Sequence, residues 1–176
     1  MTLHKRLQKD LEIGFVKNSI LDDKDKAIIE VLVKNAKTTT TDIAHKLKIS
    51  DVASRRRIKR LEENKVIEFY TAIVNPYKLG YNAVVQLMIE VEPKRIEEVA
   101  EKIAELSQTV NVYAVTGKYS IIAEVWIKNH KELLRLIREI GEIEGVKSTL
   151  PLVTTKFFKI NGLKVSMDMD ETPQQP

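Results

Sequence analysis

The chain has 176 residues, of which 43% are hydrophobic, so it can bury a core and wholesale disorder is not expected. It has no cysteine, which excludes disulfides and thiol nucleophiles, and its three histidines lack ligand spacing, which argues against structural zinc. Residues 1–70 hold 16 Lys or Arg against 11 Asp or Glu (16 − 11 = +5), whereas residues 71–176 hold 13 against 14 (13 − 14 = −1). This asymmetry predicts that the amino-terminal part meets a polyanion.

Targeting segments are not evident in the sequence. No apolar run approaches the roughly 18 residues that a membrane-spanning helix needs, and acids follow the basic start of the chain. We therefore expect a cytoplasmic protein with no membrane partner.

Residues 1–20 form a predicted amphipathic extension. Leu3, Leu7 and Leu11 recur at a spacing of four, and Phe15 continues the row beyond Gly14. We expect this extension to pack on its own domain or on a dimer partner in preference to a ligand.

Three helices are predicted within residues 21–65. The first begins with the acids around Asp22, which complement the helix dipole, and the second follows the hydroxyl run of residues 38–41. The turn at residues 48–50 then leads to a third helix, for which Ser50 is the expected N-cap. Three helices with a tight turn between the second and third describe a helix-turn-helix unit.

The third helix, SDVASRRRIKRLEEN, carries five cations within six positions. At 100° per residue, Ser54, Ile58 and Leu61 share one side, which is the predicted packing side. In a helix-turn-helix unit the amino-terminal half of this helix enters the major groove. The residues expected nearest the base edges are Asp51, Val52, Arg55 and Arg56.

The two kinds of DNA contact have different chemistry. Arg55 and Arg56 can each present a two-donor fork to guanine O6 and N7. The residues expected at phosphates are Ser50, Arg57, Lys59 and Arg60. Two assignments stay open, because Arg57 could instead bind an acid within the domain and Asp51 could simply favour the helix dipole.

Other interpretations of the basic helix are a solvated charged face, a nuclear address and RNA binding. Context disfavours the first two, because the cations follow a capped turn in the part of the chain that carries the excess charge. RNA readout would require an aromatic platform, which the sequence lacks.

Residues 66–79 are predicted to be a linking strand, Val66–Val74, and a linker marked by Asn75–Pro76. Residues 80–160 then alternate between strand and helix periods in the order β-α-β-β-α-β, which is the ferredoxin-like pattern. Only Gly117–Lys118 separates the two middle strands. Residues 161–176 are expected to be a flexible tail, because SMDMDETPQQP, residues 166–176, shows no periodic apolar face. The predicted fold class is therefore α+β.

These residues and motifs resemble the Lrp/AsnC, or feast-or-famine, family of transcriptional regulators. The similarity runs from about residue 21 to 159 and includes LDDKDKAIIEVL, DIAHKLKIS, VIEFYTAIVNPYKLGY, VYAVTGKY and EGVKSTLPLV. The resemblance implies a winged or simple helix-turn-helix domain joined by a strand to a ferredoxin-like effector and oligomerisation domain. It also implies homodimers, or tetramers and octamers, that bind palindromic operators in double-stranded DNA.

Two departures from the family pattern concern backbone turns. Glycines that the family usually has after the second and third helices correspond to Lys48 and Lys65. Because positive φ is unfavourable for lysine, either the turns differ or Asn64 takes the left-handed conformation.

Further departures concern the effector loop that the resemblance implies. Gly117-Lys118-Tyr119-Ser120 stands where the family commonly has Gly-Asp-Tyr-Asp, and Pro151 replaces a threonine near the retained Thr149. Because these acids serve the ligand's ammonium group in relatives, we expect the amino-acid response to be weakened, altered or lost, with Lys118 favouring an anion. Alternatively, Lys118 is an ordinary solvated lysine.

The sequence thus predicts a DNA-binding regulator with no cofactor, for which any small-molecule effector is unknown. An enzyme is not expected, because no nucleophile–base pair, paired acids, phosphate loop or metal spacing is evident. The alternative function is a metabolite-sensing or protein-interaction module whose helical domain does not read DNA. Richness in Lys, Glu and Ile fits a thermophilic, archaeal-like protein.

Overall fold

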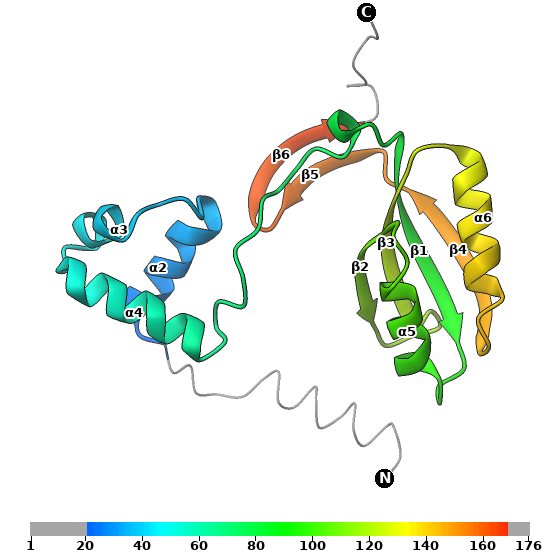
Figure 1. The fold of residues 1–176 in the computed structure, drawn as a ribbon, viewed down its shortest axis with the longest axis horizontal. Helices are drawn as coiled ribbons and strands as arrows, with labels where there is room; N and C mark the ends of the chain where they lie inside the picture. Colours follow the sequence, from blue (N-terminus) through cyan, green and yellow to red (C-terminus); the bar gives the residue numbers. More distant parts are fainter. Residues whose placement is uncertain (1–20, 169–176) are drawn as a thin grey trace, which may run out of the picture. The chain divides into compact units, whose positions relative to one another are not determined.

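The computed structural model describes residues 21–168, which divide into two units (Figure 1). Within the described range, one unit comprises residues 21–73 and 159–164, and the other comprises residues 74–158 and 165–168. The predicted amphipathic extension, residues 1–20, and the end of the predicted tail, residues 169–176, lie outside the described residues.

The first unit contains the three predicted helices, α2 (Asp23–Lys34), α3 (Thr40–Leu47) and α4 (Asp51–Glu63). Each helix starts with a side chain that accepts a backbone N–H two or three residues into the helix. Asp22 accepts from the backbone N–H of Asp25, Thr39 from that of Asp42, and Ser50 from that of Ala53. The sequence-based capping assignment of Ser50 is therefore confirmed.

One apolar core joins these helices. It is formed by the buried side chains of Ile28, Val31, Leu32, Ile43 and Leu61. Ser54 is also fully buried, and Ile58 packs against the core, which confirms the predicted packing side of α4. The opposite side of α4 is therefore available to solvent.

The turns after α3 and α4 differ from both alternatives considered from the sequence. Lys48 and Lys65 themselves adopt the left-handed conformation, with φ of 52° and 55°, whereas Asn64 has φ of −85°. The expectation that lysine would avoid this conformation is corrected, because backbone hydrogen bonds at both helix ends hold it there.

The segment that follows α4 does not form the expected strand at residues 66–74. A strand needs a neighbour for its backbone hydrogen bonds, and no strand within residues 21–168 pairs with this segment. A short 3-10 helix, η1 (Tyr77–Leu79), follows it and places Tyr77 in a buried position.

The second unit is built on a four-stranded antiparallel sheet. Its strands are β1 (Ala83–Val91), β2 (Thr109–Ala114), β3 (Ile121–Ile127) and β4 (Val146–Val153), in the spatial order β2-β3-β1-β4. With α5 (Ile96–Ala104) and α6 (His130–Gly141), the chain order is β-α-β-β-α-β. The ferredoxin-like prediction is confirmed.

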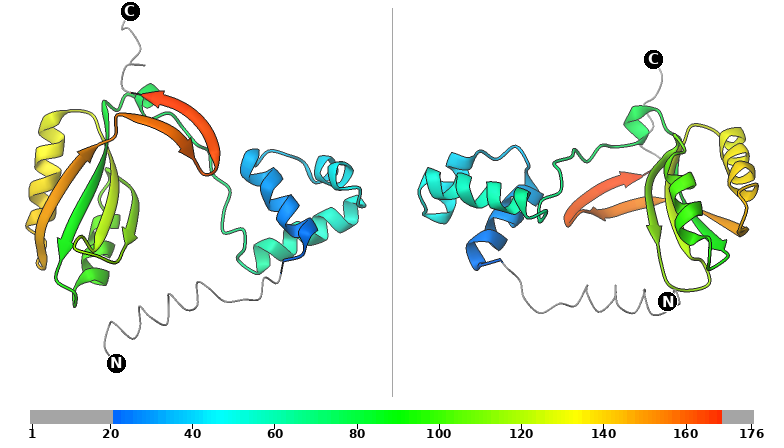
Figure 2. Two further views of the ribbon diagram at one scale, coloured as in Figure 1. Left: turned by 180° about the vertical axis from the view of Figure 1, so that it is seen from behind. Right: turned by 60° about the horizontal axis from the view of Figure 1, so that its bottom comes forward.

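Both helices of this unit cover the same face of the sheet (Figure 2). Val85, Leu87 and Ile89 of β1 point toward them and are fully buried, together with Val99 of α5 and Leu136 of α6. The register pairs Gln86 with Glu124 and Leu152, so the other face of the sheet carries a separate row of side chains.

The connection between β2 and β3 is longer than predicted. Regular pairing stops at Ala114 and resumes at Ile121, so six residues, 115–120, make the loop in place of two. Val115 still donates a backbone hydrogen bond to Ser120, which closes the loop at its base.

The expectation that the chain beyond residue 160 is an unstructured tail is corrected for residues 163–168. β5 (Lys156–Ile160) and β6 (Leu163–Asp168) form a two-stranded hairpin. Asn161 and Gly162 both have positive φ, of 46° and 81°, as a two-residue hairpin turn of this handedness requires. The Asn-Gly pair is a strong local signal for a hairpin turn, although no periodic apolar face accompanies it.

Candidate nucleic-acid interface

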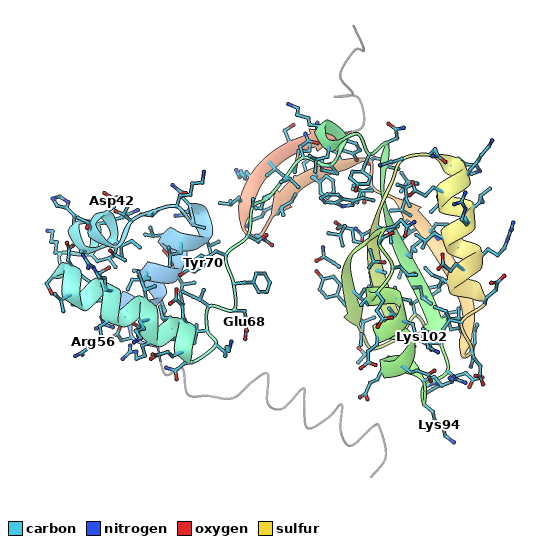
Figure 3. The ribbon with its side chains drawn as sticks, viewed as in Figure 1. Asp42, Arg56, Glu68, Tyr70, Lys94 and Lys102 are labelled. Carbon is cyan, nitrogen blue, oxygen red and sulfur yellow. The ribbon has the colours of Figure 1, made fainter. Side chains whose placement is uncertain are left out.

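The solvent side of α4 carries the side chains that were predicted to read DNA. Arg55 and Arg56 are exposed, and neither forms an ion pair with another residue in the described range, 21–168. Val52, one turn earlier, is 76% exposed. In Figure 3 the labelled side chain of Arg56 points from α4 away from α3. Two guanidinium groups are therefore presented, unneutralised, on one turn of the helix.

Arg57 and Arg60 are held differently, because both contact a buried acid on α2. Arg57 Nη1 lies 2.8 Å from Oδ1 of Asp25, and Arg60 Nη2 lies 2.5 Å from Oδ2 of the same carboxylate. Asp25 is fully buried, so these charge-assisted bonds are shielded from water. Arg57 also donates to Asp22 at 2.7 Å.

These contacts bear on the roles expected for the two arginines. The side chain of Arg57 is 24% exposed and has two carboxylate partners, which agrees with the alternative that Arg57 binds an acid within the domain. Arg60 is 46% exposed but is likewise paired. Both arginines therefore have an internal partner in Asp25, and the phosphate contacts expected for them stay a prediction.

The electrostatics of the pair follow from these hydrogen bonds. The pKa of Asp22 is lowered, first by the backbone N–H of Asp25 and then by the Arg57 guanidinium. The pKa of Arg57 is raised, first by its bond to Asp22 and then by its bond to Asp25. Both groups are therefore held in their charged forms.

The remaining predicted contacts lie at the start and the middle of α4. The Ser50 hydroxyl accepts the N–H of Ala53 at 3.2 Å, and Asp51 accepts a hydrogen bond from the Thr41 hydroxyl at 3.3 Å. Lys59 is 74% exposed and makes only a surface pair with Glu63, 3.6 Å away. Of these residues, Lys59 retains the most freedom to reach another anion.

Tyr70, in the segment that follows α4, connects this segment to the end of α4 by a hydrogen bond. The Tyr70 hydroxyl donates to Glu62 at 2.8 Å, and burial, followed by this acid, raises the pKa of Tyr70 to about 12. Phe69, the preceding residue, is 76% exposed.

Comparison with known proteins decides the family. The AsnC-type helix-turn-helix domain matches residues 21–62, and the Lrp/AsnC ligand binding domain matches residues 84–162. The HTH-type transcriptional regulator LrpA of Pyrococcus horikoshii is 39% identical over 141 residues, covering 80% of this chain and 100% of that protein. This chain belongs to the Lrp/AsnC family of transcriptional regulators.

Other Lrp/AsnC proteins are similar over nearly the same span. The HTH-type transcriptional regulator FL11 of Pyrococcus furiosus is 39% identical over 140 residues, covering 80% of this chain and 93% of that protein. The structure of Escherichia coli AsnC has a TM-score of 0.71 at 25% identity, covering 81% of this chain and 97% of that chain. The Pyrococcus relatives agree with the archaeal-like composition.

The predicted effector residues of this Lrp/AsnC chain come together only in part. Ser120 donates its backbone N–H to Ile89 on β1, and Thr149 on β4 is paired with the same residue from the other side. The loop and Thr149 therefore lie at one end of the sheet but are two strand spacings apart, about 10 Å.

Within the loop, Gly117 has φ of 127°, and Lys118 Nζ lies 5.4 Å from the centre of the Tyr119 ring. Pro151 lies on the edge strand β4 opposite Leu87, where a missing N–H is tolerated. The loop thus presents a cation and an aromatic ring, and neither Lys118 nor Pro151 supplies a carboxylate.

Sequence reasoning missed the partner of the two arginines. Asp25 stands in the acidic run DDKD, where a dipole role is the simpler interpretation, and its contacts lie 32 and 35 residues away. The spacing of three between Asp22 and Asp25 matches a capping box, which the two residues form, but it gives no signal for the arginine contacts.

The described part of the chain contains no group of three or more His, Cys, Asp or Glu residues that could hold a metal ion. Among its helices, none is long and apolar enough to cross a membrane.

Proposed function

We propose that this Lrp/AsnC regulator binds double-stranded DNA sequence-specifically through α4. The observation that carries the proposal is the pair of exposed, unneutralised arginines, Arg55 and Arg56, on the free side of a helix whose other side is packed. Such a helix can lie in the major groove while the rest of the unit holds its orientation.

The residues divide into three roles in this proposal. The base-reading group stays as expected, with Arg55 and Arg56 as the main donors and Asp51 and Val52 nearby. Ser50 and Lys59 are assigned to phosphates, whereas Arg57 and Arg60 position the helix through Asp25. Specificity and positioning are therefore carried by different arginines.

We also propose that two copies of the chain pair through the open face of the sheet, so that the protein binds palindromic operators as a dimer or as a tetramer or octamer. This face is bounded by exposed apolar residues, Tyr113, Leu150 and Leu152, at 55%, 41% and 46%. Its centre is more polar, because Glu124 accepts hydrogen bonds from Gln86 and Trp126. An apolar surface with a few directional groups suits a symmetric dimer interface.

The proposal includes no catalytic step and no cofactor. Because its ligand would be genomic DNA, we place the protein in the cytoplasm. The alternative, a metabolite-sensing or protein-interaction module, requires that the exposed arginines bind an acidic protein surface and leave duplex DNA unbound.

We further propose that the response to ordinary amino acids is weakened, altered or lost. Lys118 would repel the ammonium group of a free amino acid, and Pro151 provides neither a hydroxyl nor an N–H to its carboxylate. Each charge-assisted contact that such a ligand lacks is worth about 1.5–3 kcal/mol.

DNA binding is tested by fluorescence anisotropy with labelled mixed-sequence duplexes over a range of salt concentrations. We expect affinity to fall steeply as salt rises, because phosphate contacts release counterions. Selection from a random duplex library should then yield a palindromic sequence. Failure to bind any duplex at low salt would favour the protein-interaction alternative.

The effector proposal is tested by calorimetric titration of the full chain with each amino acid. We expect no micromolar binding, and we expect Lys118→Asp with Ser120→Asp to raise affinity by restoring acids at the loop. Micromolar binding by the unaltered chain that is lost in Lys118→Ala would contradict the proposal.

A further inference from the structure

Two lysines in the first unit occupy a backbone conformation that usually falls to glycine. Lys48 has φ of 52° and Lys65 has φ of 55°. A side chain costs energy in this left-handed region because Cβ approaches the following carbonyl oxygen, whereas glycine adopts it freely. Lysine therefore needs either a strong local constraint or another reason at these positions.

The local constraint is the same at both sites. Ile49 donates to the carbonyl of Ala44, and Val66 donates to the carbonyl of Leu61, each bond spanning five residues. Lys48 and Lys65 donate to residues three positions back, His45 and Glu62. Both helices thus end in a Schellman motif with lysine at the left-handed position. This motif dictates the conformation but does not require a charged side chain.

The surroundings of the two lysines differ in one respect. Both side chains are exposed, and neither makes an ion pair with any residue of the described range. Lys48 lies two residues before Ser50, the N-cap of α4, beside the half of the helix that would enter the groove. Lys65 follows the other end of this 13-residue helix, about 20 Å away.

We propose that Lys48 is a phosphate-binding residue that anchors the amino-terminal end of α4 on the DNA backbone. The inference rests on the proposed DNA binding by α4 and deepens it. A lysine ammonium on a long flexible stem can reach a phosphate that flanks the groove, while Arg55 and Arg56 address the bases inside it. Lys65, in the same conformation at the far end, is not part of this contact.

A phosphate contact by Lys48 explains why a lysine occupies the turn between α3 and α4. Asp25 pairs with Arg57 and Arg60, whereas Lys59, on the later turns of α4, makes only an exposed pair with Glu63 at 3.6 Å. At the opposite end of α4, Lys48 supplies a cation that makes no ion pair within the described range. Phosphate contacts on both sides of the base-reading turn fix the register of the helix on the duplex.

The matched pair of lysines separates a stability effect from a DNA effect. Lys48→Gly and Lys65→Gly relieve the same backbone conformation, so both are expected to raise the unfolding temperature, by about 2–4 °C. Only Lys48→Gly should weaken DNA binding. Lys48→Gln keeps the side-chain length and the backbone conformation but removes the charge, and Lys48→Arg keeps the charge.

The measurement is the affinity of the full chain for a mixed-sequence duplex of about 30 base pairs, taken from low to moderate salt. Lys48→Gly and Lys48→Gln should each lower the slope of log affinity against log salt by about 0.9 per bound copy, with an affinity loss of about threefold or more at low salt. Lys48→Arg and Lys65→Gly should keep the slope of the unaltered chain.

The possible outcomes separate the role of Lys48 from the proposed DNA binding by α4. If the unaltered chain binds with a steep slope and Lys48→Gln binds with the same slope, Lys48 does not contact phosphate and only this inference is overturned. Equal slope losses in Lys48→Gly and Lys65→Gly would also overturn it, since a general charge effect would then explain both. If the unaltered chain does not bind duplexes, the proposed function fails as well.

Discussion

Arg57 on α4 places Nη1 2.8 Å from Oδ1 of Asp25 on α2, and the side chain of Asp25 is fully buried. Arg60 contacts the second oxygen of the same carboxylate, so one acid holds two successive turns of α4. Because rotation of α4 about its axis would break both bonds, this contact fixes which residues of the helix face the solvent.

Removing the acid should destabilise the first unit strongly. We expect Asp25→Ala to lower the free energy of unfolding by about 3–5 kcal/mol, because two arginines lose their buried counterion. Denaturant unfolding followed by circular dichroism measures the change. Asp23→Ala is the matched control, since Asp23 is fully exposed and makes only a surface pair with Lys26. Similar losses in both variants would contradict the positioning role.

Substitution of Arg57 and substitution of Lys59 on α4 should have opposite effects on stability and on the salt slope of DNA binding. We expect Arg57→Met to lower stability but, under conditions where the variant is folded, to keep the salt slope of duplex binding. Lys59→Met should leave stability nearly unchanged and lower that slope by about 0.9 per bound copy. Anisotropy titrations and unfolding curves of both variants provide the comparison. A lowered salt slope in Arg57→Met would show that Arg57 contacts a DNA phosphate.

Tyr70 should make the first unit sensitive to alkaline pH. Its folded pKa of about 12 lies above the ordinary tyrosine pKa of 10.0, so its stabilising effect is complete below about pH 10 and is lost as pH rises toward 12. Ultraviolet absorbance of tyrosinate measures the titration. In the Tyr70→Phe variant, one tyrosine fewer should ionise near pH 12. If the variant instead lacks a tyrosine that ionises near pH 10, the result would be inconsistent with the hydrogen bond to Glu62.

The open sheet face can be tested with two leucines of similar exposure. Leu152 on β4 is 46% exposed on that face, and Leu134 on α6 is 49% exposed. We expect Leu152→Glu to weaken self-association by about tenfold or more, because a carboxylate would be desolvated in the interface. Leu134→Glu should leave it unchanged. Sedimentation velocity of both variants decides, and an unaffected Leu152→Glu assembly would place the interface elsewhere.

Local patterns were sufficient for most of the fold. The N-cap Ser50, the packed side of α4 with Leu61 and the alternation along β1 are set by residues close in sequence, so they could be predicted. The turn at Asn161–Gly162 was also local, but it was overlooked because the chain after it has no helical or strand periodicity long enough to stand out.

The rest of the site depends on contacts that sequence spacing does not reveal. Asp25 meets Arg57 only after three helices have packed, and the same acid would look identical at an exposed helix start. The conformation of Lys48 was judged from the intrinsic preference of lysine, whereas the Schellman hydrogen bonds of α3 override that preference. Predicting the roles of the arginines therefore required the packed unit.

Sequence readout by Arg55 and Arg56 is the central claim, and one comparison tests it most directly. The affinities of the unaltered chain, Arg55→Ala and Arg56→Ala are measured for a selected operator and for a random duplex at one salt concentration. We predict that each variant loses about 1–3 kcal/mol on the operator and much less on the random duplex, so that the ratio of the two affinities falls. Equal losses on both duplexes would contradict base reading by α4.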